Sequence, residues 1–157
     1  MTKIKVLVVE DEKIVAKDIQ YRVRSLGYDV CGIASSGEEA IENADTYRPD
    51  LILMDIQLKG GIDGVMAADK IRSFLDVPII YLTAYNDKKT LDRTKLTNPY
   101  GYILKPFEDR DLFTGIEMAL NKHRIDKSIR ESEKWLSTVL QSIGDAVITT
   151  DTEGTIV

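Results

Sequence analysis

Polar and charged residues stand at the ends of four short apolar runs in this 157-residue sequence. They are Glu10 and Asp11 after IKVLVV, Asp55 after LILM, Thr83 at the end of PIIYLT, and Lys105 after YGYIL. A carboxylate can act as the nucleophile in phosphoryl transfer, and hydroxyl and ammonium groups can bind phosphate oxygens. If the apolar runs are neighbouring strands, these side chains meet at one site.

The acidic residues of this set carry more charge than one lysine can balance. Like charges in contact raise each other's pKa and lower stability unless a cation lies between them. Mg²⁺ prefers carboxylate and carbonyl oxygens and keeps positions for water and phosphate. Taken singly, Glu10 and Asp11 could equally be acids at a helix N-terminus. Together with Asp55 and Lys105 they predict Mg²⁺-assisted phosphoryl transfer to an aspartate.

Five apolar runs alternate with amphipathic segments along the first 123 residues. The runs cover 4–9, 28–34, 51–54, 78–83 and 100–104, and the amphipathic segments cover 14–26, 36 onward, 65–75, about 87–96 and 108 onward. Runs that are apolar throughout are typical of strands buried on both faces of a parallel sheet. The pattern predicts an α/β fold, a flavodoxin-like doubly wound (βα)5 sheet with strand order 2-1-3-4-5 and a C-terminal helical extension. Sites in such sheets form at the carboxyl ends of the strands.

Local signals mark the ends of several expected helices. Gly27 and Pro78 follow two of the amphipathic segments, where a helix commonly stops. Ser36 and Glu39 have the spacing of a capping box at the start of the second helix. Ile14 is the first apolar residue of the first helical pattern.

The composition excludes several classes of function. The net charge of −5 gives no basic field for nucleic acid or an anionic membrane. No apolar run approaches the ~20 residues of a membrane span, and no signal peptide opens the chain, so we expect a cytoplasmic protein. A single cysteine, Cys31, excludes an internal disulfide, and a single histidine, His123, argues against a structural zinc site.

Residues 1–123 resemble the receiver domain of bacterial and archaeal two-component response regulators. The resemblance rests on the acid pair, the aspartate after the third strand, the threonine followed by a small residue, and the Lys-Pro pair after the fifth strand. It implies that Asp55 accepts a phosphoryl group from a sensor histidine kinase or phosphotransfer protein. It also implies that Asp11, Asp55 and the backbone carbonyl of Gln57 bind Mg²⁺, with Glu10 reaching the ion directly or through water.

The same resemblance implies how phosphorylation changes the domain. Lys105 and Thr83 would bind the phosphate oxygens, and the small side chain of Ala84 would keep the approach open. Tyr102 would rotate inward and change the face formed by the fourth helix, fifth strand and fifth helix. The Lys105–Pro106 peptide bond is expected to be cis.

Residues 124–144 are predicted to form a helical linker. Apolar residues fall close to a heptad pattern at Ile125, Ile129, Leu136, Val139 or Leu140, and Ile143, with Ser132 interrupting it. The pattern fits a coiled coil, and it also fits a helix that docks on its own receiver. We therefore expect a homodimer through this helix, through the fourth-helix, fifth-strand and fifth-helix face, or through both.

The pattern changes after Gly144. The stretch GDAVITTDTEGTIV predicts a strand, a turn and the start of a second strand. It resembles the entry of a PAS sensory domain, so residues 145–157 are expected to be a truncated N-terminal fragment of one. A lone hairpin is marginal in water, so this fragment is not expected to sense a ligand by itself.

Three functions are compatible with these residues. The first is a phosphorylation-controlled signalling switch, which is not an enzyme acting on an external substrate. The second is an aspartyl-phosphate hydrolase, but such phosphatases usually carry an aspartate two residues after the nucleophile, where this chain has Gln57. The third is a dimerisation scaffold, which the intact set of Asp55, Thr83 and Lys105 disfavours.

Overall fold

The computed structural model describes residues 3–84 and 101–150, with side chains described through Gln141. The chain divides into two compact units, Met1–His123 and Arg124–Val157. The fourth helix predicted at about 87–96 lies outside the described residues.

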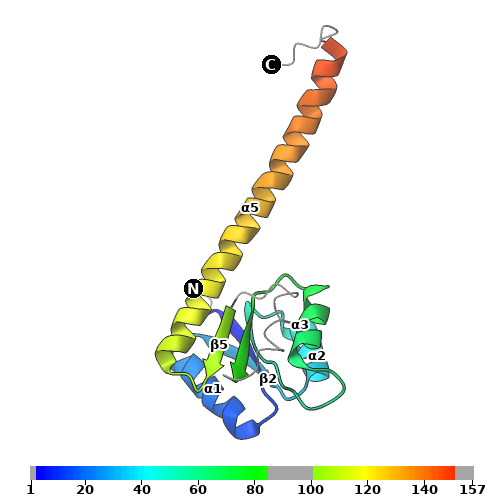
Figure 1. Cartoon of the computed structure of the whole chain (residues 1–157). Coiled ribbons are helices and arrows are strands. Elements are labelled where there is room, and N and C mark those ends of the chain that lie inside the picture. Colours follow the sequence, from blue (N-terminus) through cyan, green and yellow to red (C-terminus); the bar gives the residue numbers. More distant parts are fainter. Residues whose placement is uncertain (1–2, 85–100, 151–157) are drawn as a thin grey trace. The chain divides into compact units, whose positions relative to one another are not determined.

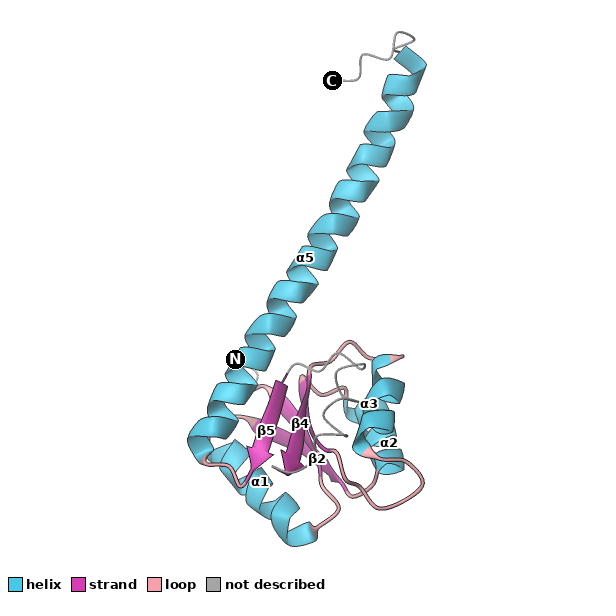
Figure 2. Ribbon diagram, in the orientation of Figure 1, coloured by secondary structure: helices cyan, strands magenta, loops and turns pink. Residues whose placement is uncertain are grey.

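The first unit is built on a parallel sheet of five strands, shown in Figures 1 and 2. The strands are β1 (Lys5–Val9), β2 (Asp29–Ala34), β3 (Leu51–Asp55), β4 (Ile79–Ala84) and β5 (Gly101–Lys105). Their order is β2-β1-β3-β4-β5, which confirms the predicted doubly wound topology. The central strands are buried on both faces, as their unbroken apolar sequence requires.

The register of the sheet brings the carboxyl ends of its strands to one edge. Val9 at the end of β1 pairs with Met54, and Asp55 at the end of β3 pairs with Leu82. Lys105 ends β5 opposite Ala84. Residues that follow these strands are therefore held within reach of one another by backbone hydrogen bonds.

Helices cover both faces of the sheet (Figure 2). They are α1 (Lys13–Ser25), α2 (Gly37–Tyr47), α3 (Gly64–Arg72) and α5 (Asp109–Thr150). Ile19 of α1 and Ile116 of α5 pack in the core on one face, and Ala44 of α2 and Ile71 of α3 pack on the other. Ile14 is 85% exposed, because it lies off the α1 face that carries Ile19 toward the sheet.

The predicted helix ends are largely confirmed. The Ser36 hydroxyl accepts a hydrogen bond from the Glu39 backbone N–H at 3.1 Å, as in a capping box. The Glu39 carboxylate accepts from the backbone N–H and hydroxyl of Ser35 instead of from the Ser36 N–H. Gly27 follows α1 with a φ of +100°, a conformation that L side chains rarely adopt.

The second unit contains the continuation of α5, which runs through Thr150. The helical linker predicted at 124–144 is therefore helical, but the strand predicted from residue 145 is wrong as far as Thr150. The β-branched residues there favour a strand, yet a strand needs a partner for its backbone hydrogen bonds, and a helix satisfies them locally. Within residues 3–84 and 101–150, no helix combines the length and apolar character needed to cross a bilayer.

Candidate functional site

A cavity of about 520 Å³ opens at the carboxyl edge of the sheet. It is lined by residues at or just after the carboxyl ends of β1, β3, β4 and β5, including Glu10, Asp11, Asp55, Gln57, Lys59, Thr83, Ala84 and Lys105. The structure thus brings together all the polar residues that the sequence places at the ends of these strands.

Lys105 lies between two buried carboxylates. Its ammonium nitrogen donates to Oε2 of Glu10 at 3.0 Å and to Oδ2 of Asp55 at 3.1 Å. Glu10 is 2% exposed and Asp55 is 7% exposed, so water compensates little of their charge. Among the described residues, Lys105 contacts both acids and compensates part of their charge.

These contacts shift two pKa values in the site. Burial, followed by the hydrogen bond and repulsion from Asp55, raises the pKa of Glu10 to about 7, although Lys105 acts in the opposite direction. Burial lowers the pKa of Lys105, but Asp55 and Glu10 more than offset this effect, and the net pKa lies above the ordinary value. The ammonium is therefore kept charged, while proton loss from Glu10 is opposed.

Asp11 adds a third carboxylate on the more exposed side of the cavity. One oxygen each from Glu10, Asp11 and Asp55 lie within 4.8 Å of one another. Three hard oxygen donors at this separation fit a Mg²⁺ ion, which would replace part of their mutual repulsion by attraction. Glu10, Asp11 and Asp55 are the side chains that would hold it.

Backbone groups orient the two aspartates of this set. The N–H of Gln57 donates to Oδ1 of Asp55 at 3.1 Å, and the N–H of Lys59 donates to Oδ2 of Asp11 at 3.3 Å. The loop after β3 therefore fixes both carboxylates. Because Oδ1 of Asp55 accepts from the Gln57 N–H, Oδ2 faces Lys105.

The remaining predicted residues lie beside the cavity. The Thr83 side chain is buried, and its hydroxyl donates to the Ala84 carbonyl at 3.3 Å. Tyr102 is 38% exposed on β5, and its ring stacks on that of buried Tyr81 with centroids 6.2 Å apart. The Lys105–Pro106 peptide bond is cis.

Sequence reasoning missed three residues that shape this region. Lys59 contributes a backbone N–H to Asp11, and a backbone contact leaves no signal in residue type. Tyr81 carries the ring on which Tyr102 stacks, and its register opposite Tyr102 could have been found by aligning β4 with β5. Gly64 is the third.

Gly64 lets α3 begin directly against the end of β3. Its N–H donates to the Ile56 carbonyl at 2.9 Å. A Cβ at this position would overlap the carbonyl oxygen of Asp55 and lie 2.9 Å from Cα of Ile56. No larger residue fits this close approach without displacing the backbone of the loop that holds Asp55.

Comparisons with known proteins agree with this architecture. Residues 6–117 match the response regulator receiver domain family. The transcriptional regulatory protein PdtaR of Mycobacterium tuberculosis is 36% identical over 120 residues, which are 76% of this chain and 58% of that protein. The chain spans about half the length of the curated relatives it matches.

Two solved structures show the same fold. The signal receiver domain of a modulated diguanylate cyclase from Desulfovibrio desulfuricans G20 is 40% identical, with a TM-score of 0.75 over 80% of this chain and 99% of that one. The N-terminal domain of a response regulator/sensory box/GGDEF 3-domain protein from Carboxydothermus hydrogenoformans is 38% identical, with a TM-score of 0.72 over 78% and 98%. This chain therefore belongs to the response regulator receiver domain family of two-component signalling proteins.

Proposed function

We propose that this receiver domain is a phosphorylation-controlled switch in which Asp55 is the phosphoryl acceptor. One observation carries the proposal: the buried Asp55 carboxylate lines the cavity with Lys105 at 3.1 Å and the Glu10 and Asp11 carboxylates alongside. Receiver domains are phosphorylated by histidine kinases or phosphotransfer proteins, so a phosphohistidine side chain is the proposed donor.

The proposed reaction is one displacement at phosphorus. A carboxylate oxygen of Asp55 attacks the phosphorus, a new O–P bond forms, and the P–N bond of the phosphohistidine breaks. The leaving imidazole nitrogen keeps the electron pair and takes up a proton. Lys105 stabilises the negative charge that spreads over the phosphoryl oxygens, because its ammonium is already positioned beside Asp55.

Mg²⁺ is the proposed cofactor, held by Asp11, Asp55 and the Gln57 carbonyl, with Glu10 directly or through water. When bound, the ion neutralises phosphoryl charge and orients the transferring group. The donor set supports this assignment because all of its side-chain ligands are carboxylates.

We propose a switch and not a phosphatase for external substrates. Gln57 stands two residues after Asp55 at the cavity wall, and its amide side chain has no acidic proton to give to a leaving group. Only self-phosphorylation and slow self-dephosphorylation are then expected.

The proposed readout begins at Thr83 and Tyr102. The Thr83 hydroxyl would exchange its contact with the Ala84 carbonyl for a phosphate oxygen, and Tyr102 would move inward. This inward movement would disturb the stack between Tyr102 and Tyr81. A local charge would thereby bias a two-state element on β5.

We further propose that residues from 145 onward begin a PAS-type sensory domain and that the protein acts as a homodimer. The Carboxydothermus relative, described as a receiver followed by a sensory box, supports the first part. Exposed apolar residues along α5 support the second.

The phosphoryl proposal is tested by intact mass after incubation with acetyl phosphate and Mg²⁺. We expect one added phosphoryl group, absent without Mg²⁺ and absent in Asp55→Asn. Asp69→Asn is the matched control, because Asp69 is an exposed aspartate of α3 outside the cavity. No uptake by the folded protein, or equal uptake by Asp55→Asn, would contradict the proposal.

A further inference from the structure

α5 carries a stripe of apolar side chains at heptad positions, interrupted at Ser132. In heptad notation, Ile129 and Leu136 occupy a positions, and Ile125 and Val139 occupy d positions. Ile125 is 58% exposed, and Ile129 and Leu136 are each 50% exposed. These four residues are called the α5 seam. Their spacing places them on one side of the helix, so a second surface is needed to bury them.

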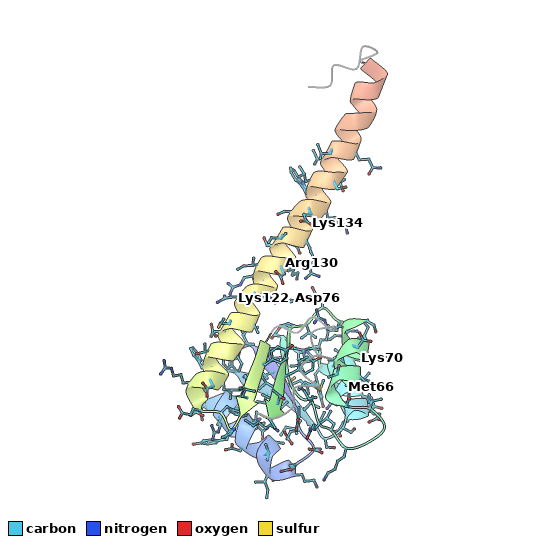
Figure 3. All side chains as sticks on the ribbon, in the orientation of Figure 1. Met66, Lys70, Asp76, Lys122, Arg130 and Lys134 are labelled. Atoms are coloured by element: carbon cyan, nitrogen blue, oxygen red, sulfur yellow. The ribbon has the colours of Figure 1, made fainter. Side chains whose placement is uncertain are left out.

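Further apolar residues flank the seam, and polar residues occupy the rest of the helix. Trp135 lies at a g position and Leu140 at an e position, and both are exposed. Arg130 and Lys134, labelled on α5 in Figure 3, occupy a b and an f position, which are outer positions of the heptad. An apolar a/d stripe with polar outer positions is typical of a coiled coil.

We propose that the α5 seam pairs with the same seam of a second copy of this chain as a parallel, in-register, two-stranded coiled coil. The inference specifies the homodimer of the proposed function, and it does not depend on phosphoryl transfer. Two features of the sequence of α5 support a second copy as the partner and a parallel orientation.

The first feature is the polar residue that interrupts the seam. Ser132 falls at a d position between Ile129 and Leu136. Parallel, in-register pairing sets Ser132 opposite Ser132 of the second copy and leaves the layers formed by the four seam residues apolar. An antiparallel pair with full overlap would set Ser132 opposite Ile129. Such a mixed layer buries a hydroxyl against an apolar side chain, which is unfavourable.

The second feature is the charge at the positions that flank the seam. Both acidic e positions, Asp126 and Glu133, face g positions of the second copy in a parallel pair. Those g positions are Asn121 and Ser128, whose amide and hydroxyl can donate to carboxylates. An antiparallel pair would bring Asp126 beside Glu133 of the second copy, where like charges repel.

The same register gives the aromatic residue a partner. In a parallel pair the g position of Trp135 lies beside the e position of Leu140 in the second copy. Each pair would therefore cover one exposed indole and one exposed leucine next to Leu136 and Val139. This contact widens the apolar interface near residues 135–140 and offsets the polar layer at Ser132.

Cross-linking tests the orientation in the full 157-residue chain. In a Cys31→Ser background, Val139→Cys places a thiol in the seam and Ser137→Cys places one at an outer b position. Parallel pairing brings the two seam thiols within disulfide reach, whereas antiparallel pairing separates them by about 25 Å. We expect mild oxidation to give a covalent dimer with Val139→Cys and little with Ser137→Cys. Equal yields from the two variants would overturn the proposal.

Sedimentation equilibrium tests the number of strands and the role of the seam. The wild-type mass should be that of a dimer, and Leu136→Asn should raise the dimer dissociation constant about tenfold or more. Thr138→Asn, at an exposed c position, should leave it unchanged. Phosphoryl uptake from acetyl phosphate, measured on the same samples, reports separately on the receiver. A wild-type monomer or trimer, or equal effects of the two variants, would overturn the proposal whether or not phosphoryl uptake occurs.

Discussion

The ammonium of Lys105 lies 3.1 Å from the Asp55 carboxylate, and this contact joins the end of β5 to the end of β3. The same ammonium lies 3.0 Å from Glu10, so one cation compensates two buried acids. Its position is the one from which a cation could stabilise a phosphoryl group arriving at Asp55.

Replacement of this lysine should slow phosphoryl uptake without abolishing Mg²⁺ binding. Lys105→Met keeps much of the stem and removes the charge that would stabilise the transition state, so uptake from acetyl phosphate should fall about tenfold or more. Mg²⁺ affinity should rise or stay the same, because a competing cation is removed from the carboxylates. The rate of uptake is measured by intact mass at timed intervals after adding acetyl phosphate, and the Mg²⁺ affinity by calorimetric titration. Unchanged uptake would show that Lys105 has no part in the chemistry.

The raised pKa of Glu10 predicts a pH dependence of stability in the metal-free protein. The pKa is 4.5 ordinarily and about 7 in the folded protein. Between these values the folded state retains a proton that the unfolded state has released, so the contribution of Glu10 is complete at low pH and is lost as the pH rises through about 7. The loss should be on the order of 3 kcal/mol.

Glu10→Gln isolates this contribution from that of other acids. The unfolding free energies of wild type and Glu10→Gln are measured by urea denaturation with EDTA present. The stability of the wild type relative to the variant should fall as the pH rises from 4.5 to about 7. Mg²⁺ should stabilise the wild type more at about pH 8 than at about pH 5, because metal binding requires ionised carboxylates. A difference that is independent of pH would contradict the assigned pKa direction.

The close approach of Gly64 to the end of β3 predicts a specific sensitivity to one methyl group. Gly64→Ala should destabilise the domain by about 1–3 kcal/mol, because its Cβ would overlap the Asp55 carbonyl oxygen. Phosphoryl uptake should fall with it, since the displaced loop also fixes the Asp55 carboxylate. Gly101→Ala is the control, because, apart from its chain neighbours, no atom of the described residues lies within 4 Å of the Cβ it would add. Equal stability of the two variants in thermal denaturation would refute the packing explanation.

The stack of Tyr102 on Tyr81 predicts a spectroscopic sign of switching. With fluorotyrosine incorporated throughout, phosphorylation should shift the ¹⁹F resonance of Tyr102, because the ring leaves its present position beside Tyr81. Tyr102→Phe assigns the resonance, and Asp55→Asn treated in the same way should show no shift. A Tyr102 signal that stays in place in fully phosphorylated protein would exclude this residue as the readout.

The sequence was sufficient to predict the sheet and the members of the site. Unbroken apolar runs define strands buried on both faces, and parallel strands necessarily bring Asp55, Thr83 and Lys105 to one edge. The contacts made by backbone atoms could not be predicted, because the hydrogen bond from the Lys59 N–H and the space at Gly64 depend on the path of the loop after β3. The strand expected from residue 145 was wrong as far as Thr150, where the chain is helical, since β propensity is a weak preference that depends on the surroundings of the segment.

If the site works as proposed, the phosphoryl group is attached to Asp55 itself. Treatment of the acetyl-phosphate reaction with borohydride converts an aspartyl phosphate to homoserine, and tandem mass spectrometry of the peptides then locates the modified residue. We expect homoserine at position 55 in the Mg²⁺ sample and none in the sample with EDTA. Modification at Glu10, Asp11 or any other residue in place of Asp55 would contradict it.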